Sequence, residues 1–367
     1  MSRVLAIAEA LEEGRLRGPL SHWLARAWER LASRSVVRRL EWPTGRRIVA
    51  VGGATLGGSG KTPIAMACAV ELAAAGARVA FVGHGYGGRL GAARVVGAHD
   101  AVSIVGDEAL MAARALGPRV PVFVGPRRAQ AVALAAVHAD VLVLDGVAQT
   151  APIGATLALL VVDGEEPWGR AEAVPPRGDL RAPKESLLSA CDAIVPVGAG
   201  ASNGSPRADR AFWPASTASR GAWMPALAHT LRRTLLTWED LRRLRVGLVV
   251  ALARPSRVLR TLAQQGVAVE AVVRFPDHGP LGRGAGRRCR RVARQARIDL
   301  WLMTPKCAVH LPPSEGAVEC RAPSTHRRPG AWRGRRDHWF GAPVATLEHS
   351  IALSPALCAR LRALASP

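Results

Sequence analysis

Residues 49–63, with the sequence VAVGGATLGGSGKTP, constrain the fold of this chain more than any other segment. An apolar run ends in a glycine-rich turn, the turn ends in Gly-Lys-Thr, and an apolar helical pattern follows over residues 63–75. This order is the setting of a phosphate-binding loop, in which backbone N–H groups and a helix N-terminus surround phosphate oxygens. Thr55 stands where the general pattern has its first glycine, but the later glycines keep the turn flexible. The segment therefore predicts a nucleotide site rather than a chance glycine turn.

Lysine is rare in this chain, which makes the lysine of this turn informative. Only three of the 50 basic residues are lysines, although arginine is used almost everywhere else. A compact ammonium group fits between β- and γ-phosphate oxygens where a guanidinium group would not, so we expect Lys61 to reach the terminal phosphate. The Thr62 hydroxyl is expected to bind Mg²⁺. The predicted nucleotide-binding residues are Thr55, Gly57, Gly58, Ser59, Gly60, Lys61 and Thr62.

Continuous apolar runs of strand length recur along the first two hundred residues. Strands buried on both faces have such runs, and the helical stretches between them indicate a parallel sheet. The predicted fold class is α/β, a P-loop NTPase-like doubly wound parallel sheet with a second, smaller α/β domain. Ligands of such sheets bind beyond the carboxyl ends of the strands. The runs cover residues 47–53, 78–83, 120–125, 140–146, 157–164 and 191–198.

Composition shifts divide the chain into parts. Residues 198–220, rich in Gly, Ser, Ala and Pro, are expected to form a loop or linker, and residues 312–337 a surface segment. Further strands are expected at 245–252, 267–275 and 299–304, and the chain is expected to end in a strand and a helix. We expect an N-terminal amphipathic helical segment, a P-loop domain, a smaller α/β domain and a C-terminal strand and helix, at residues 1–40, 41–240, 241–345 and 346–367.

The N-terminal segment has helical spacing of apolar residues over 3–33, broken by Gly14, Gly18 and Pro19 into two helices. Its apolar side carries two tryptophans, with arginines between. Two interpretations remain open: a helix packed on its own domain, or a basic amphipathic helix lying in a membrane interface. The longest uncharged run, 146–162, holds proline and glycines, so a membrane-spanning helix is not expected. No secretory signal is visible, and we expect a cytoplasmic location.

The formal charge of +22 also leaves two interpretations open, a dispersed basic surface or a functional patch. Charge alone would favour a P-loop ATPase that binds nucleic acid, with steep salt dependence. No recognition motif for DNA or RNA is visible, so no nucleic-acid partner is expected.

Beyond the glycine-rich turn, a series of short segments resembles one family closely. GGATLGGSGKTP resembles the phosphate loop of the tetraacyldisaccharide 4'-kinases, the lipid A 4'-kinases, in which Thr commonly occupies the same first position. Other segments resemble that family in the same order along nearly the whole chain: HGYGG (84–88), VGDEALM (105–111), VPVFVGPRR (120–128), DLRAP (179–183), RFPDHG (274–279) and MTPKCAV (303–309).

The resemblance implies transfer of a phosphoryl group from ATP, with Mg²⁺, to the 4'-hydroxyl of a lipid-linked glucosamine disaccharide. It places the protein peripherally on the anionic inner face of the cytoplasmic membrane, and we expect a monomer. A sugar hydroxyl needs a nearby base, and Asp107 orienting His278 is expected to supply it. The alternatives are a chance surface aspartate for Asp107 and a structural strand-end histidine for His278. The implied roles are catalytic for Asp107, His278 and Lys61, substrate-binding for His84, Tyr86 and Arg181, and metal-binding for Thr62 and Asp145.

The chain departs from the family at its acidic pair. The family has two adjacent aspartates, followed by Gly, an apolar residue, Gln and His, whereas this chain has LDGVAQT over 144–150, so only Asp145 remains. If Asp145 matches the first aspartate, Gln149 falls on the Gln and Thr150 replaces the His. A single carboxylate can still hold Mg²⁺. The alternative hypothesis is a nucleotide-binding relative that has lost phosphoryl transfer and has a regulatory or interaction role.

Overall fold

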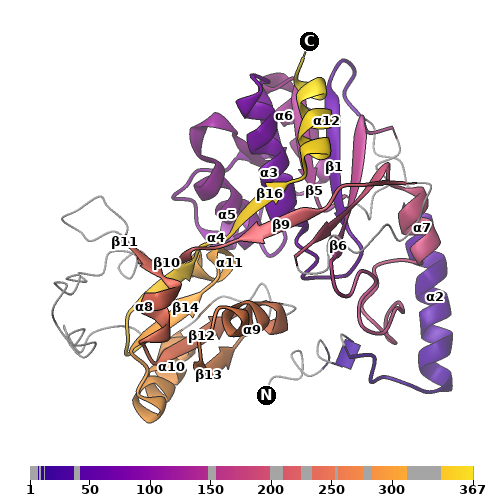
Figure 1. Cartoon of the computed structure of the whole chain (residues 1–367). Coiled ribbons are helices and arrows are strands. Elements are labelled where there is room, and N and C mark those ends of the chain that lie inside the picture. The colour runs from indigo at the N-terminus through magenta and orange to yellow at the C-terminus, as the bar shows by residue number, and fades with distance from the viewer. Residues whose placement is uncertain are drawn as a thin grey trace. The chain divides into compact units, whose positions relative to one another are not determined.

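The computed structural model describes residues 7, 10–11, 13–36, 42–147, 154–198, 210–224, 234–252, 255–275, 281, 283–311 and 340–366. The chain divides into two compact units, Met1–Ala218 together with Ser350–Pro367, and Ser219–His349. Each unit has its own sheet with helices beside it (Figure 1), which confirms the predicted α/β class. The domain boundaries expected from the sequence at residues 40, 240 and 345 stay predictions.

The first unit is built on a mostly parallel sheet with the strand order β16-β9-β7-β6-β1-β5-β2-β4-β3, and β8 pairs with β7. Strand β1 (Arg47–Gly53) is parallel to β5 on one side and to β6 on the other. Because β2 follows β1 in the chain but lies beyond β5, the strand order reverses at β1, where ligands of such sheets bind. The other strands are β2 (Val79–Val82), β3 (Arg94–Val95), β4 (Val122–Val124), β5 (Val141–Asp145), β6 (Leu157–Asp163), β7 (Ala193–Val197), β8 (Ala211–Phe212), β9 (Ala215–Ala218) and β16 (Ser350–Leu353).

The central strands are buried on both faces, as their continuous apolar runs predict. Ile48 and Ala50 pack into a core with residues of helix α6, whereas helix α3 contacts β1 and β5. The helices of this unit are α2 (Pro19–Val36), α3 (Lys61–Ala74), α4 (Val102–Val105), α5 (Asp107–Leu116), α6 (Arg128–His138), α7 (Lys184–Ser189) and α12 (Pro355–Ala365), with a 3-10 helix at Gly117–Arg119.

The segment 198–220 differs from the expected loop. Strands β8 and β9 lie within it, and β9 pairs antiparallel with β16 from the end of the chain. The small residues of this segment give no strand pattern in the sequence. The short strands form because they pair with strands elsewhere in the chain. The end of the chain accordingly holds two strands and a helix rather than one strand and a helix.

The second unit has a sheet with the order β11-β10-β15-β14-β12-β13, in which β12 is parallel to β13 and β14. Helix α9 contributes Leu262 to one core, and α10 contributes Cys289 to another. The strands are β10 (Gly221–Met224), β11 (Thr234–Thr237), β12 (Val246–Val250), β13 (Val269–Arg274), β14 (Leu300–Met303) and β15 (Val344–Leu347), and the helices are α8 (Trp238–Arg242), α9 (Pro255–Gln264), α10 (Arg283–Ala296) and α11 (Pro305–Ala308). The predicted surface segment 312–337 lies outside the described residues.

The N-terminal segment breaks where the sequence predicts. Gly14 and Gly18 have positive φ angles of 63° and 143°, and α2 begins at Pro19. Ala25 of α2 is buried in a core with residues of α7. Across the described residues, no helix combines the length and the apolar character that crossing a bilayer requires.

Candidate active site

The glycine-rich turn connects the carboxyl end of β1 to the N-terminus of α3, as predicted for a phosphate loop. Gly60 caps the helix in the left-handed region, with φ 86° and ψ 12°, and Gly58 has φ 72°. A side chain at either position would strain the turn. A Cβ on Gly53 would lie 2.2 Å from the Ser59 hydroxyl oxygen, so the loop folds closely over the end of β1. The N-terminus of α3 is therefore presented beyond the sheet, where it can bind an anion.

A second segment holds the beginning of this loop in place. Thr55 is 2% exposed, forms an antiparallel bridge with Leu180, and donates its hydroxyl to the Gly57 carbonyl at 2.9 Å. The Nη2 of Arg181 donates to the carbonyls of Thr55 and Leu56, each at 3.2 Å. Thr55 thus acts within the loop as a structural residue, and Arg181 contacts the loop directly.

Thr62 and Asp145 form the center of the candidate site. The Thr62 hydroxyl donates to Oδ2 of Asp145 at 2.6 Å, although the residues are 83 positions apart. Asp145 is 1% exposed at the end of β5, and its Oδ1 has no hydrogen-bond partner among the described residues. Burial raises the pKa of Asp145, and the charge of Lys61 opposes that rise. A buried carboxylate oxygen without a proton donor favours a cation.

This pair fits a magnesium ion. Mg²⁺ prefers oxygen ligands and usually takes one or two from the protein, with phosphates and waters completing its shell. The Thr62 hydroxyl and the Asp145 carboxylate supply such oxygens beside the phosphate loop. No larger group of His, Cys, Asp and Glu able to hold a metal occurs within the described ranges.

Lys61 and two arginines bring positive charge to the same place. The Lys61 Nζ lies 3.7 Å from Oε1 of Glu108. Arg128 donates its Nη1 to the Asp145 carbonyl at 2.7 Å. Burial lowers the pKa of Arg128 and of Arg181, and Asp145 partly offsets both shifts. Enclosed cations of this kind can neutralise the charge of a triphosphate.

His84 and Tyr86 lie in the segment after β2. Their rings meet edge to face, with centroids 6.1 Å apart. Partial burial and the positive charges of Arg128 and Lys61 lower the pKa of His84 to about 4, so the imidazole is neutral at pH 7. A Cβ on Gly146 would lie 3.9 Å from Cδ2 of His84, which places the ring beside the Asp145 turn. Tyr86 is 59% exposed.

Asp107 begins α5 and is 3% exposed, with its Oδ1 accepting the Glu108 N–H at 2.8 Å. Asp107 is therefore buried, unlike a chance surface aspartate, and its catalytic role stays a prediction. His278, Gln149 and Thr150 lie outside the described residues, so the pairing of Asp107 with His278 stays a prediction.

Two residues of the site were not predicted. Glu108 contacts Lys61, and Arg128 holds the backbone of Asp145, although both lie in segments that resemble the family. The position of Arg128 just after β4, at the carboxyl edge of the sheet, is the signal that could have identified it.

Comparisons with known proteins agree with this geometry. A sequence profile of the family described as LpxK, tetraacyldisaccharide-1-P 4'-kinase, matches residues 18–327. The chain belongs to the tetraacyldisaccharide 4'-kinase family. A tetraacyldisaccharide 4'-kinase from Methylobacterium radiotolerans is 36% identical over 286 residues, covering 75% of this chain and 80% of that protein. One from Anaeromyxobacter dehalogenans is also 36% identical over 286 residues, covering 74% of each chain.

A solved structure from the same family shares the fold. The crystal structure of LpxK from Aquifex aeolicus, an "apo" form in complex with ATP, matches with a TM-score of 0.62 at 17% identity. The match covers 94% of this chain and 96% of that chain. The doubly wound α/β fold predicted from the sequence is thereby confirmed for this member of the tetraacyldisaccharide 4'-kinase family.

Proposed function

We propose that this chain transfers the γ-phosphoryl group of ATP to the 4'-hydroxyl of a tetraacyldisaccharide 1-phosphate, a step of lipid A biosynthesis. The observation that carries the proposal is the phosphate loop with Lys61 beside the buried Thr62–Asp145 pair, in a chain of this kinase family. Phosphoryl transfer depends mainly on positioning and on neutralising charge, and this site supplies both.

Each residue has a role in that reaction. The N–H groups at the start of α3 bind the phosphates, and Lys61 contacts the terminal phosphate. Thr62 and Asp145 hold Mg²⁺, which supplies positive charge to the phosphate oxygens. Asp107, with His278, is proposed to accept the proton of the sugar hydroxyl. His84, Tyr86 and Arg181 are proposed to bind the disaccharide.

The proposal is tested by supplying purified protein with tetraacyldisaccharide 1-phosphate and Mg-ATP, and we expect the 4'-phosphorylated product, measured by mass spectrometry. The loss of one aspartate from the acidic pair motivates the competing hypothesis of a nucleotide-binding relative without kinase activity. Binding of ATP with no product at any enzyme concentration would favour that relative.

The lipid substrate requires contact with a membrane surface, and α2 has the chemistry for it. Its apolar residues Leu20, Trp23 and Leu31 are 70%, 67% and 65% exposed. At helical spacing these side chains share one face of α2. Exposure of this apolar face to water is unfavourable. We therefore propose that α2 lies on the inner face of the cytoplasmic membrane with this face, called here the apolar face, in the lipid interface.

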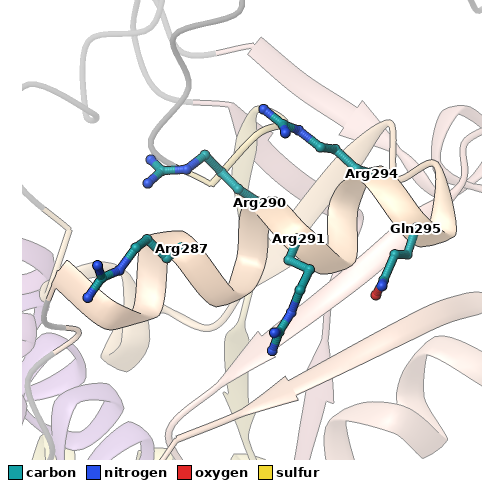
Figure 2. A pocket seen from close by; sticks show the side chains of 5 residues that line it. All are labelled: Arg287, Arg290, Arg291, Arg294 and Gln295. Carbon is teal, nitrogen blue, oxygen red and sulfur yellow. The ribbon is translucent and has the colours of Figure 1, made fainter.

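Helix α10 of the second unit has the charge expected for an anionic partner. Arg287, Arg290, Arg291, Arg294 and Gln295 line a pocket along it, and their side chains extend away from the helix (Figure 2). Elsewhere, arginines commonly pair with carboxylates, as Arg78 does with Asp140 at 2.8 Å. Arg287, Arg291 and Arg294 make no ion pair within the part of the chain that the structure describes. Each unpaired cation near an anionic lipid surface contributes about 1 kcal/mol to the free energy of membrane binding.

Substitution of Leu20, Trp23 and Leu31 together by glutamine is expected to weaken binding to phosphatidylglycerol vesicles at least about tenfold, because apolar area can no longer enter the interface. Cosedimentation with the vesicles measures the fraction of each protein that is bound. Val137→Gln is the matched control, because Val137 is 74% exposed but lies on α6. Unchanged partitioning of the triple variant would show that the apolar face does not contact lipid.

A further inference from the structure

One side chain connects α2 to the segment that supports the phosphate loop. The indole Nε1 of Trp28 donates a hydrogen bond to the backbone carbonyl of Arg181 at 3.1 Å. The two residues are 153 positions apart, so this is a tertiary link between α2 and the rest of the first unit.

On its other side, Arg181 is paired with the start of the phosphate loop. The Arg181 N–H donates to the Ala54 carbonyl at 2.8 Å, and the Leu56 N–H donates to the Asp179 carbonyl at 2.8 Å. These bonds flank the antiparallel bridge between Thr55 and the segment 179–181. The peptide units around Arg181 therefore join α2 on one side and residues 54–56 on the other.

The position of Trp28 on α2 explains how one ring can take part in two environments. Residues advance by about 100° along a helix, which puts Trp28 between the buried face of Ala25 and the apolar face of Trp23. Its exposure of 38% lies between the 4% of Ala25 and the 67% of Trp23. The N–H of the Trp28 ring donates to the Arg181 carbonyl at the surface, and the residue as a whole remains 38% exposed beside the apolar face.

We propose that Trp28 is a positioning residue of the nucleotide site. Its N–H fixes the Arg181 carbonyl and, through the paired segment, the first residues of the phosphate loop. The inference rests on the proposed function in one respect, namely that this loop binds ATP.

The test removes the N–H and keeps the ring. In lipid-free buffer, Trp28→Phe is expected to raise the Kd for Mg-ATP about fivefold, as loss of one hydrogen bond allows, measured by isothermal titration calorimetry. Trp23→Phe is the matched control on the same helix, because the Trp23 indole makes no hydrogen bond to any described residue. Its Kd for Mg-ATP is expected to equal that of the wild type.

Weaker ATP binding by Trp28→Phe alone, at an unchanged melting temperature, supports the positioning role. An unchanged Kd in Trp28→Phe overturns it, and so does equal weakening in both variants. If the wild type fails to bind Mg-ATP at all, the proposed function falls as well, so the two failures are distinguishable.

Discussion

Replacement of Lys61 by alanine is expected to lower kcat for 4'-phosphorylation at least about a thousandfold, with little loss of folding. The ammonium group is the compact positive charge at the N-terminus of α3, whereas the other cations described at the site, Arg128 and Arg181, are bulkier guanidinium groups. It lies 3.7 Å from Glu108, and both side chains are less than one-fifth exposed. The measurement is a steady-state kinase assay together with a thermal melt of each protein.

Lys184→Ala is the control for this variant, because Lys184 is another of the three lysines but stacks on Trp168, 4.7 Å from the ring centroid. We expect Lys184→Ala to retain wild-type turnover. Substantial remaining activity in Lys61→Ala would show that the glycine-rich turn is not the phosphate site.

Replacement of Asp145 by asparagine is expected to lower kcat about a hundredfold or more and to raise the Mg²⁺ concentration needed for half-maximal activity. The amide keeps the shape of the side chain and can still accept the Thr62 hydroxyl, but it lacks the negative charge that binds the cation. A second measurement does not depend on turnover: Mg-ATP is expected to raise the melting temperature of the wild type more than that of the variant.

Asp140→Asn is the matched control, since Asp140 precedes the same strand but lies at its opposite end, where it pairs with Arg78 on the surface. Wild-type Mg²⁺ dependence in Asp145→Asn would mean that another group holds the metal, and the Thr62–Asp145 pair would then be only structural.

Much of the fold of the first unit could be predicted because its central strands are buried on both faces. The predicted runs 140–146 and 157–164 correspond to β5 (Val141–Asp145) and β6 (Leu157–Asp163). Strands buried on both faces consist of continuous apolar residues, so a single sequence is enough to identify them. Strands β8 and β9 were not predicted, because these short strands have no continuous apolar run and are stabilised by distant partners.

The residues of the candidate site could likewise be predicted only in part. Thr62 and Asp145 could be predicted together, because the loop after β1 and the end of β5 meet at one edge of a parallel sheet. Arg128 escaped prediction, because one arginine among 50 basic residues has no compositional signal. Glu108 was not predicted for another reason. Its contact with Lys61 depends on the folded structure and follows from no spacing along the chain.

The first unit is assembled from two separated stretches of the chain, Met1–Ala218 and Ser350–Pro367. Strand β9 belongs to the first stretch, and its antiparallel partner β16 belongs to the second. The residues of that second stretch follow the whole second unit in the order of synthesis. During synthesis the edge of β9 must therefore stay unpaired, and α3 must wait for the packing of α12, until the whole second unit has been made. The nascent chain is thus expected to complete the packing around α3, whose first residues belong to the candidate nucleotide site, only after the second unit has been made.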